Sequence, residues 1–335
     1  MGKLATEDLA KLLSCIKKNP NVIIPPKPGY DSGVHRLPDG RCLVVSTDPC
    51  IGVPNEWFGW LLIHYASSDV ALFGARPQFC TINLLAPPST TTKEFHKIMN
   101  QTCKAADELE MTIITGHTGT YRGLVVPVGV CTAYGIIKEE ELITPEGARP
   151  RDLILCTKPI GLELAVNFAM THPELAKKIF GPKSVRQLAK QVPQQSCVKE
   201  ALLLSKTGCV NAMHDATEGG LTAALNEMAE ASNVGFRVDF GKIPISKEVL
   251  KLQKHFHLSD EQVLSMSSTG TIIASISARK RSQVRKTIEK NLKPRAELIG
   301  TFTQSKDRTL LIQGKERAFP KEPQDPYERI LSAKQ

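Results

Sequence analysis

The chain has 335 residues, 41% hydrophobic and 23% charged, a balance typical of globular proteins and a length that favours two domains. Its formal net charge is +9, but the basic residues are interspersed with acids and aromatics make up only 5%, which argues against a nucleic-acid partner. No C-x-x-C pair, bilayer-length apolar run or signal-peptide pattern is present, so we expect a cytoplasmic protein without structural zinc and without a membrane partner.

The first part of the chain alternates predicted helices and strands. Residues 1–19 form an amphipathic pattern that ends at Pro20, and Pro38-Asp-Gly40 predicts the turn of a hairpin. Thr91 and Glu94 have the spacing of a capping box, followed by apolar residues at helical intervals. The other elements predicted here are strands at 34–37, 42–46, 79–85, 112–115 and 125–137 and a helix at 55–65.

The segment 144–152 contains two prolines and a glycine and is the predicted domain boundary. After it, the patterns predict strands at 153–156, 236–239, 271–276 and 308–312, and helices at 163–172, 184–191, 195–207, 219–229 and 279–291. We therefore expect an α/β (or α+β) protein. Its N-terminal domain covers residues 1–145, its C-terminal domain covers 150–320, and a polar tail covers 321–335.

Four aspartates stand where a predicted strand or helix gives way to a loop. They are Asp31, Asp48, Asp69 and Asp215. Each alone fits a turn or a helix cap. Together they match the hard oxygen ligands that Mg²⁺ prefers, with nucleotide phosphates completing its shell.

Glycines follow a predicted strand at Gly116 and open a predicted helix at Gly219 and Gly220. Glycine lets backbone N–H groups approach a phosphate closely, and the start of a helix favours anions. The sequence contains neither G-x-x-x-x-G-K-[ST] nor G-x-G-x-x-G, which argues against a P-loop or a dinucleotide-binding fold.

Five motifs occur in an order that resembles a known superfamily. They are Val44-Val-Ser-Thr-Asp48, Ser68-Asp69-Val-Ala-Leu-Phe-Gly-Ala-Arg-Pro77, Thr115-Gly-His-Thr118, Met213-His-Asp-Ala-Thr-Glu-Gly-Gly-Leu221 and Met266-Ser-Ser-Thr-Gly-Thr271. The chain resembles, from about Gly29 to Gly314, the superfamily of aminoimidazole ribonucleotide (AIR) synthetase, selenophosphate synthetase, thiamine-monophosphate kinase and HypE. It most resembles HypE and archaeal synthetase-related proteins.

The resemblance implies a two-domain PurM-like fold, in which the N-terminal mixed sheet with its helices pairs with a second copy into a barrel and the C-terminal domain is an α/β sandwich. It also implies a homodimer that binds ATP and Mg²⁺ between its domains. By motif, the metal ligands are Asp31, Asp48 and Asp69, and the catalytic residues are Asp48, Asp69 and His117. The implied cofactor-binding residues are Asp31, Gly116, Thr118, Asp215, Glu218, Gly219 and Gly220.

The implied activity is transfer of the γ-phosphate of ATP to an oxygen of a small-molecule or protein-borne substrate. The alternative is a nucleotide-binding scaffold or maturation partner without activity. The C-terminal cysteine of HypE has no counterpart here, so we expect no nitrile formation. His117 stands where the kinases have aspartate. It either replaces a metal ligand, contacts phosphate or acts as an acid, or else hydrogen-bonds within a turn.

Overall fold

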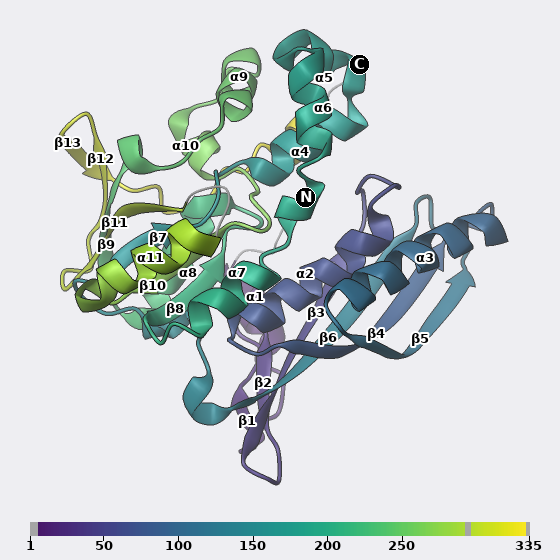
Figure 1. Ribbon diagram of the computed structural model, residues 1–335, viewed down its shortest axis with the longest axis horizontal. Helices are drawn as coiled ribbons and strands as arrows, with labels where there is room; N and C mark the ends of the chain where they lie inside the picture. The colour runs from purple at the N-terminus through teal and green to yellow at the C-terminus, as the bar shows by residue number, and fades with distance from the viewer. Residues whose placement is uncertain (1–5, 292–295, 333–335) are drawn as a thin grey trace. The chain divides into compact units, whose positions relative to one another are not determined.

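The computed structural model describes residues 6–291 and 296–332, which divide into two compact units. One unit covers Lys11–Leu142, and the other covers Ile143–Gln335 together with Met1–Ala10. Each unit is built around its own mixed sheet (Figure 1). Within the described residues, no helix is both long and apolar enough to cross a bilayer.

The unit Lys11–Leu142, called the N-terminal unit below, has a six-stranded sheet in the order β1-β2-β3-β6-β4-β5. All neighbours are antiparallel except β4 and β5. Its elements are β1 (Val22–Ile24), β2 (Gly33–Arg36), β3 (Arg41–Cys50), α2 (Phe58–Leu72), β4 (Pro77–Ala86), α3 (Thr92–Glu108), β5 (Thr112–Thr120), β6 (Val128–Lys138) and η1 (Glu139–Glu141). Helices α2 and α3 lie over one face of this sheet (Figure 1).

The two sheet faces differ because residues alternate along each strand. On β3, the even-numbered residues Cys42, Val44, Ser46 and Cys50 are buried on the side that α2 covers, whereas Arg41 and Thr47 on the other side are exposed. We call these sides the helix face and the open face. Asp48, which shares the parity of Ser46, lies on the helix face.

The second unit contains a seven-stranded sheet in the order β13-β12-β9-β11-β7-β10-β8, antiparallel except for β12 and β9. Its strands are β7 (Leu153–Cys156), β8 (Val210–Asp215), β9 (Gly235–Asp239), β10 (Ile272–Ile276), β11 (Glu297–Thr303), β12 (Arg308–Ile312) and β13 (Lys315–Ala318). Its helices are η2 (Pro145–Gly147), α4 (Leu162–Thr171), α5 (Pro173–Phe180), α6 (Pro182–Ala189), η3 (Val192–Gln195), α7 (Val198–Ser205), α8 (Gly220–Ser232), η4 (Phe240–Lys242), α9 (Lys247–His255), α10 (Asp260–Leu264), η5 (Ala278–Lys280), α11 (Arg281–Asn291) and α12 (Tyr327–Leu331).

The predicted helix over residues 1–19 is shorter in the structure, where α1 covers Thr6–Leu13 and residues 1–5 lie outside the described part. After Leu13, the Ser14 hydroxyl and the Cys15 thiol donate to carbonyls three residues back. Such local side-chain bonds compete with further helical turns.

Candidate functional site

Asp69 lies inside a helix, so its predicted place on a loop is wrong. Helix α2 continues to Leu72 and buries Asp69, which is 5% exposed. Ser67 and Ser68, which precede it, are also buried. Because α2 is buried on nearly every side, no amphipathic period marks where it ends.

A buried hydrogen bond joins Asp69 to strand β3. The Ser46 hydroxyl donates to Asp69 Oδ2 over 2.7 Å, and Ser46 is 2% exposed. The bond fixes one oxygen of the carboxylate against the helix face. The sequence analysis missed Ser46, although its parity with Asp48 in the same strand was a usable signal.

The prediction that Asp48 closes a strand is wrong, because Asp48 lies within β3. Pairing of β3 with β6 continues beyond it, with Asp48 opposite Cys131 and Cys50 opposite Gly129. Residues i and i+2 of a strand are about 7 Å apart on one face, so Asp48 and the Ser46-bound Asp69 are neighbours on the helix face.

Two buried thiols, those of Cys50 and Cys131, lie close enough to Asp48 to be affected by its charge. Burial, and then the negative charge of Asp48, raises the pKa of Cys50 well above its ordinary value. The Cys131 pKa is raised as well, by its hydrogen bond with Cys80, by burial and by Asp48. Asp48 contributes carboxylate oxygens at this position, and these are the ligands that a hard cation prefers.

Asp31 belongs to the loop that precedes β2. The preceding residue, Tyr30, packs edge-on against Phe73 with ring centroids 6.4 Å apart, and the Lys27 ammonium lies 3.7 Å from the centroid of the Tyr30 ring. Phe73 directly follows α2. The loop that carries Asp31 is thus anchored beside the helix end whose last turn carries Asp69.

The segment Gly116-His117-Thr118 lies within β5, so its predicted place in a loop after a short strand is wrong. Parallel pairing with β4 extends from Phe79 opposite Thr112 to Ala86 opposite Thr120. A Cβ atom at Gly116 would overlap the backbone oxygen of Ile82, so the close approach of β4 already requires glycine there.

His117 and Thr118 point to different faces of the sheet. Thr118 pairs with Leu84 and lines a pocket with α3, which places it on the helix face. His117 pairs with Asn83 and lies on the open face, opposite to the face of Asp48. Its Nε2 atom is 2.5 Å from the Tyr121 hydroxyl. The structure therefore places Asp48 and Asp69 on one face of the sheet and His117 on the other.

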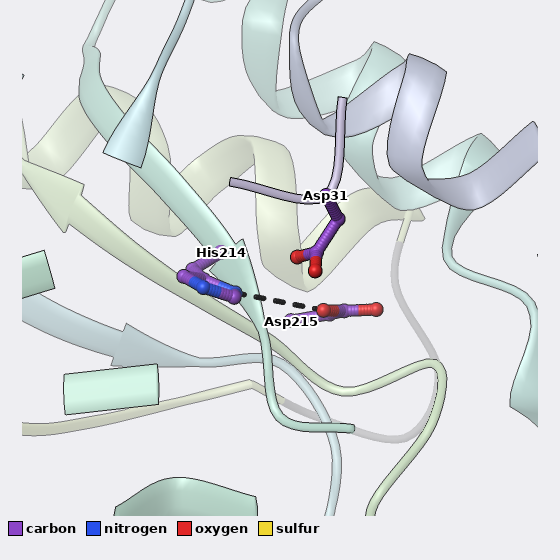
Figure 2. Close-up of side chains that lie close together, drawn as sticks. All are labelled: Asp31, His214 and Asp215. Carbon is purple, nitrogen blue, oxygen red and sulfur yellow. Dashed lines mark ion pairs between the residues drawn. The ribbon is translucent and has the colours of Figure 1, made fainter. Parts of the chain in front are cut away.

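In the second unit, Asp215 is the last residue of β8 and is 2% exposed, as is His214 before it. His214 Nε2 is 2.8 Å from a carboxylate oxygen of Glu227 on α8. Its Nδ1 is 3.5 Å from Asp215 Oδ1, the ion pair drawn in Figure 2. His214 thus links the end of β8 to α8.

Two glycines start α8, and both have positive φ, +80° at Gly219 and +57° at Gly220. A Cβ atom at Gly220 would overlap the backbone oxygen of Met266, so packing alone requires this glycine. The Gly219 N–H donates to Asp325 Oδ2 at 3.2 Å. Glu218, just before them, is exposed.

The last of the five motifs, residues 266–271, is held by Glu163 of α4. The Glu163 carboxylate accepts hydrogen bonds from the Thr269 hydroxyl at 2.5 Å and from the Thr269 backbone N–H at 3.3 Å. Burial raises the pKa of Glu163. Glu163, Asp325 and Tyr327 were not among the predicted site residues, because nothing local in the chain indicates that they lie close together.

Comparisons with known proteins agree with this architecture. The family model described as AIR synthase related protein, N-terminal domain, matches residues 29–137, and the C-terminal domain model matches residues 149–313. The chain therefore belongs to the AIR synthase-related family, and the expected PurM-like two-domain fold is confirmed.

Three relatives illustrate the family. The chain is 29% identical over 257 residues to a selenide, water dikinase of Myxococcus xanthus (strain DK1622), covering 74% of this chain and 69% of that protein. A hydrogenase maturation protein HypE solved in complex with ATP has a TM-score of 0.72 at 19% identity, covering 96% and 91% of the two chains. ThiL complexed with AMPPCP and TMP has a TM-score of 0.73 at 19% identity, covering 96% of each. At these identities the two structures show a shared fold.

Proposed function

We propose that this protein is an ATP- and Mg²⁺-dependent enzyme that transfers the γ-phosphate of ATP to an oxygen of a small-molecule or protein-borne substrate. The observation that carries the proposal is that two carboxylates share the helix face: Asp69 is hydrogen-bonded to Ser46, and Asp48 lies two residues further along the same strand. Membership of a family with a dikinase, and a fold shared with proteins solved with ATP or AMPPCP, support it.

In this proposal, Asp48, Asp69 and the loop residue Asp31 hold Mg²⁺, which when bound neutralises phosphate charge. Carboxylate oxygens are the ligands that Mg²⁺ prefers. The chain's own residues fix the ion and orient the phosphates, so that the substrate oxygen attacks the γ-phosphorus and ADP leaves. Positioning and charge stabilisation account for most of such catalysis.

The remaining residues named by motif are proposed for the nucleotide itself. Thr118 and Gly116 share the helix face with the two aspartates. The other four lie from the end of β8 to the start of α8: Asp215, Glu218, Gly219 and Gly220. His117 has a hydrogen-bonding partner on the open face, and we give it no place at the cation.

Thermal unfolding with nucleotide tests the proposal. A ligand that binds only the native state stabilises it, by about 2.7 kcal/mol at a concentration of 100 Kd. We expect ATP with Mg²⁺ to raise the unfolding temperature, and ATP with EDTA to do so much less. No shift at millimolar ATP and Mg²⁺ would refute ATP binding. A shift without ADP release over a panel of substrates would favour the scaffold alternative.

Ser46 offers a sharper test of the cation site. Ser46→Ala removes the hydroxyl that fixes Asp69, and we expect the apparent Mg²⁺ affinity to fall roughly 10- to 100-fold, as for other groups that orient a metal ligand. The measurement is the Mg²⁺ concentration dependence of the ATP-induced stabilisation.

The matched control is Thr47→Ala. Thr47 is the next hydroxyl on the same strand, but it faces the open side and accepts a hydrogen bond from Thr132 at 3.0 Å. Thr47→Ala should leave the Mg²⁺ dependence of the ATP-induced stabilisation unchanged. Equal effects of the two substitutions, or none at Ser46, would contradict the assignment.

The open face is the surface that we propose for the homodimer. It carries Leu43, Val45, Tyr134 and Ile136, which are only half-buried, and Phe79, whose ring stacks on Tyr134 with centroids 5.1 Å apart. No helix of the described N-terminal unit covers these residues. Burying such an apolar sheet face against a second copy would remove it from water.

We expect Tyr134→Asp to shift the protein from dimer to monomer in sedimentation velocity, because it buries a charge at the centre of that face. Asn100→Asp adds the same charge to the exposed side of α3 and should leave the dimer intact. A wild-type chain that sediments as a monomer at tens of micromolar would show that this face does not pair.

A further inference from the structure

The segment after β13 crosses the surface of the second unit and is attached to it along its length. Phe319 is 2% exposed and packs edge-on against Phe236, with ring centroids 4.9 Å apart. The Asn226 amide on α8 donates to the backbone oxygens of Pro320 and Lys321, at 2.9 Å and 3.1 Å. These contacts fix the beginning of residues 319–331, which we call the strap. The match to the family model ends before it, at residue 313.

The far end of the strap is fixed as well. The Tyr327 hydroxyl accepts a hydrogen bond from the Asn167 amide of α4 at 2.9 Å. The Arg329 guanidinium donates to the backbone oxygen of Phe256 at 3.0 Å, and Ile330 is fully buried. The strap is therefore held at both ends, with its middle drawn across the start of α8.

The middle of the strap covers the first glycine of that helix. A Cβ atom at Gly219 would lie 2.9 Å from the Pro323 Cβ atom, so only glycine leaves room for the strap. Asp325 Oδ2 accepts from the Gly219 N–H at 3.2 Å, and Oδ1 accepts from the Tyr327 N–H at 2.9 Å. The backbone of Ser267 also hydrogen-bonds to the Asp325 carboxylate. A carboxylate thus takes the N–H group that the sequence analysis assigned to a phosphate.

Acidic side chains around Asp325 disfavour the binding of a second anion at the Gly219 N–H group. Glu163 on α4 and Glu218 on the loop before α8 both act on the Asp325–Tyr327 region electrostatically. A phosphate at Gly219 would compete for the same N–H donor, and at pH values where Asp325 is ionised it would also be repelled by that carboxylate.

We propose that the strap is an autoinhibitory segment: Asp325 occupies the start of α8 in place of a nucleotide phosphate, so nucleotide binding at this loop requires residues 319–331 to leave it. The inference rests on the proposed function, to which it adds a regulatory step. Binding of ATP and docking of the strap then oppose each other, and each weakens the other by the same factor.

Docking of the strap should also depend on pH. Burial is the main cause that raises the Asp325 pKa to about 6 from its ordinary 3.8. The docked state thus holds this proton more tightly than the released state. This proton therefore stabilises the docked state fully below pH 3.8, and the stabilisation is lost as the pH rises through about 6. Burial also raises the Glu163 pKa, which acts in the same direction, and the Tyr327 pKa is raised far enough that its hydroxyl stays protonated.

Binding of ATP–Mg²⁺ to the full chain, measured by calorimetry, tests the proposal. At pH 6 we expect Asp325→Ala to bind about tenfold more tightly than the wild type, because the binding-competent fraction rises. The difference in ATP–Mg²⁺ affinity between this variant and the wild type should be smaller at pH 7.5. Glu322→Ala removes the same charge from an exposed strap position and should match the wild type.

Hydrogen exchange of peptides spanning 319–331, corrected for the intrinsic rate at each pH, reports the strap directly. Protection should fall when ATP–Mg²⁺ is added and when the pH rises from 5.5 to 7.5. Asp325→Asn keeps an acceptor but no titrating charge at residue 325, so its protection should change with pH much less than in the wild type, leaving only the part due to Glu163. A strap that stays protected while nucleotide is bound, or an Asp325→Ala variant that binds no more tightly than Glu322→Ala, would overturn the proposal. Absence of binding by all variants would instead refute the proposed function.

Discussion

Replacing Asp48 by asparagine is expected to lower ATP turnover roughly 100- to 1,000-fold, because it removes one negative ligand from the cation while keeping the shape of the side chain. Asp69→Asn should act similarly, since Asp69 is the buried partner of Ser46 on the same face. The measurement is ADP release at saturating Mg²⁺, together with the Mg²⁺-dependent rise in unfolding temperature. Both signals should be lost together in either variant.

Asp39→Asn is the matched control for these substitutions. Asp39 lies in the turn between β2 and β3 of the same unit, is exposed, and pairs with Arg41 over 2.7 Å. The Asp39→Asn variant loses the same charge in this turn and not on the helix face, so its ADP release should stay at the wild-type level. If Asp48→Asn turned over ATP as fast as Asp39→Asn, the carboxylate pair would not be the cation site.

Gly220→Ala is expected to destabilise the second unit by roughly 3 kcal/mol. An alanine at φ +57° is strained by about 1–2 kcal/mol, and its Cβ atom overlaps the Met266 backbone oxygen, which adds an overpacking cost of about 1–3 kcal/mol. Urea unfolding followed by far-ultraviolet circular dichroism measures the change as a lower midpoint.

Gly208→Ala separates the two contributions. Gly208 has nearly the same backbone angle, φ +59°, and an added Cβ atom would meet nothing within 4 Å. We expect it to cost only the strain, about 1–2 kcal/mol. Equal midpoints for the two variants would show that α10 and its following turn do not press on the start of α8.

The parts of the fold that local sequence determines were predicted well. Thr91 and Glu94 form the expected capping box, and α3 begins directly after them. The turn at Pro38-Asp-Gly40 joins β2 and β3 as expected, with Gly40 at φ +83°. In these cases the signal and the structure lie within the same few residues, so no distant partner was needed.

The errors arose where distant segments decide the local structure. The length of β5 depends on its parallel partner β4, so residues 116–118 looked like a loop after a short strand. Helix α2 buries all its sides and lacks a periodic pattern, which hid the true position of Asp69. The strands and α-helices that were not predicted are β1, β8, β11, β13, α5, α9, α10 and α12. The contact of Asp325 with Gly219 joins residues 106 positions apart.

Side chains alternate along β3, so neighbouring residues of this strand are exposed to different constraints. Ser46 and Asp48 face α2, while Val45 and Thr47 face the open side. Substitutions at Ser46 and Asp48 should therefore act on the proposed cation site, and substitutions at Val45 and Thr47 should act on contacts with whatever covers the open face. Because the two sets point to opposite sides of the sheet, the open face can change by substitution while the carboxylates on the helix face stay in place.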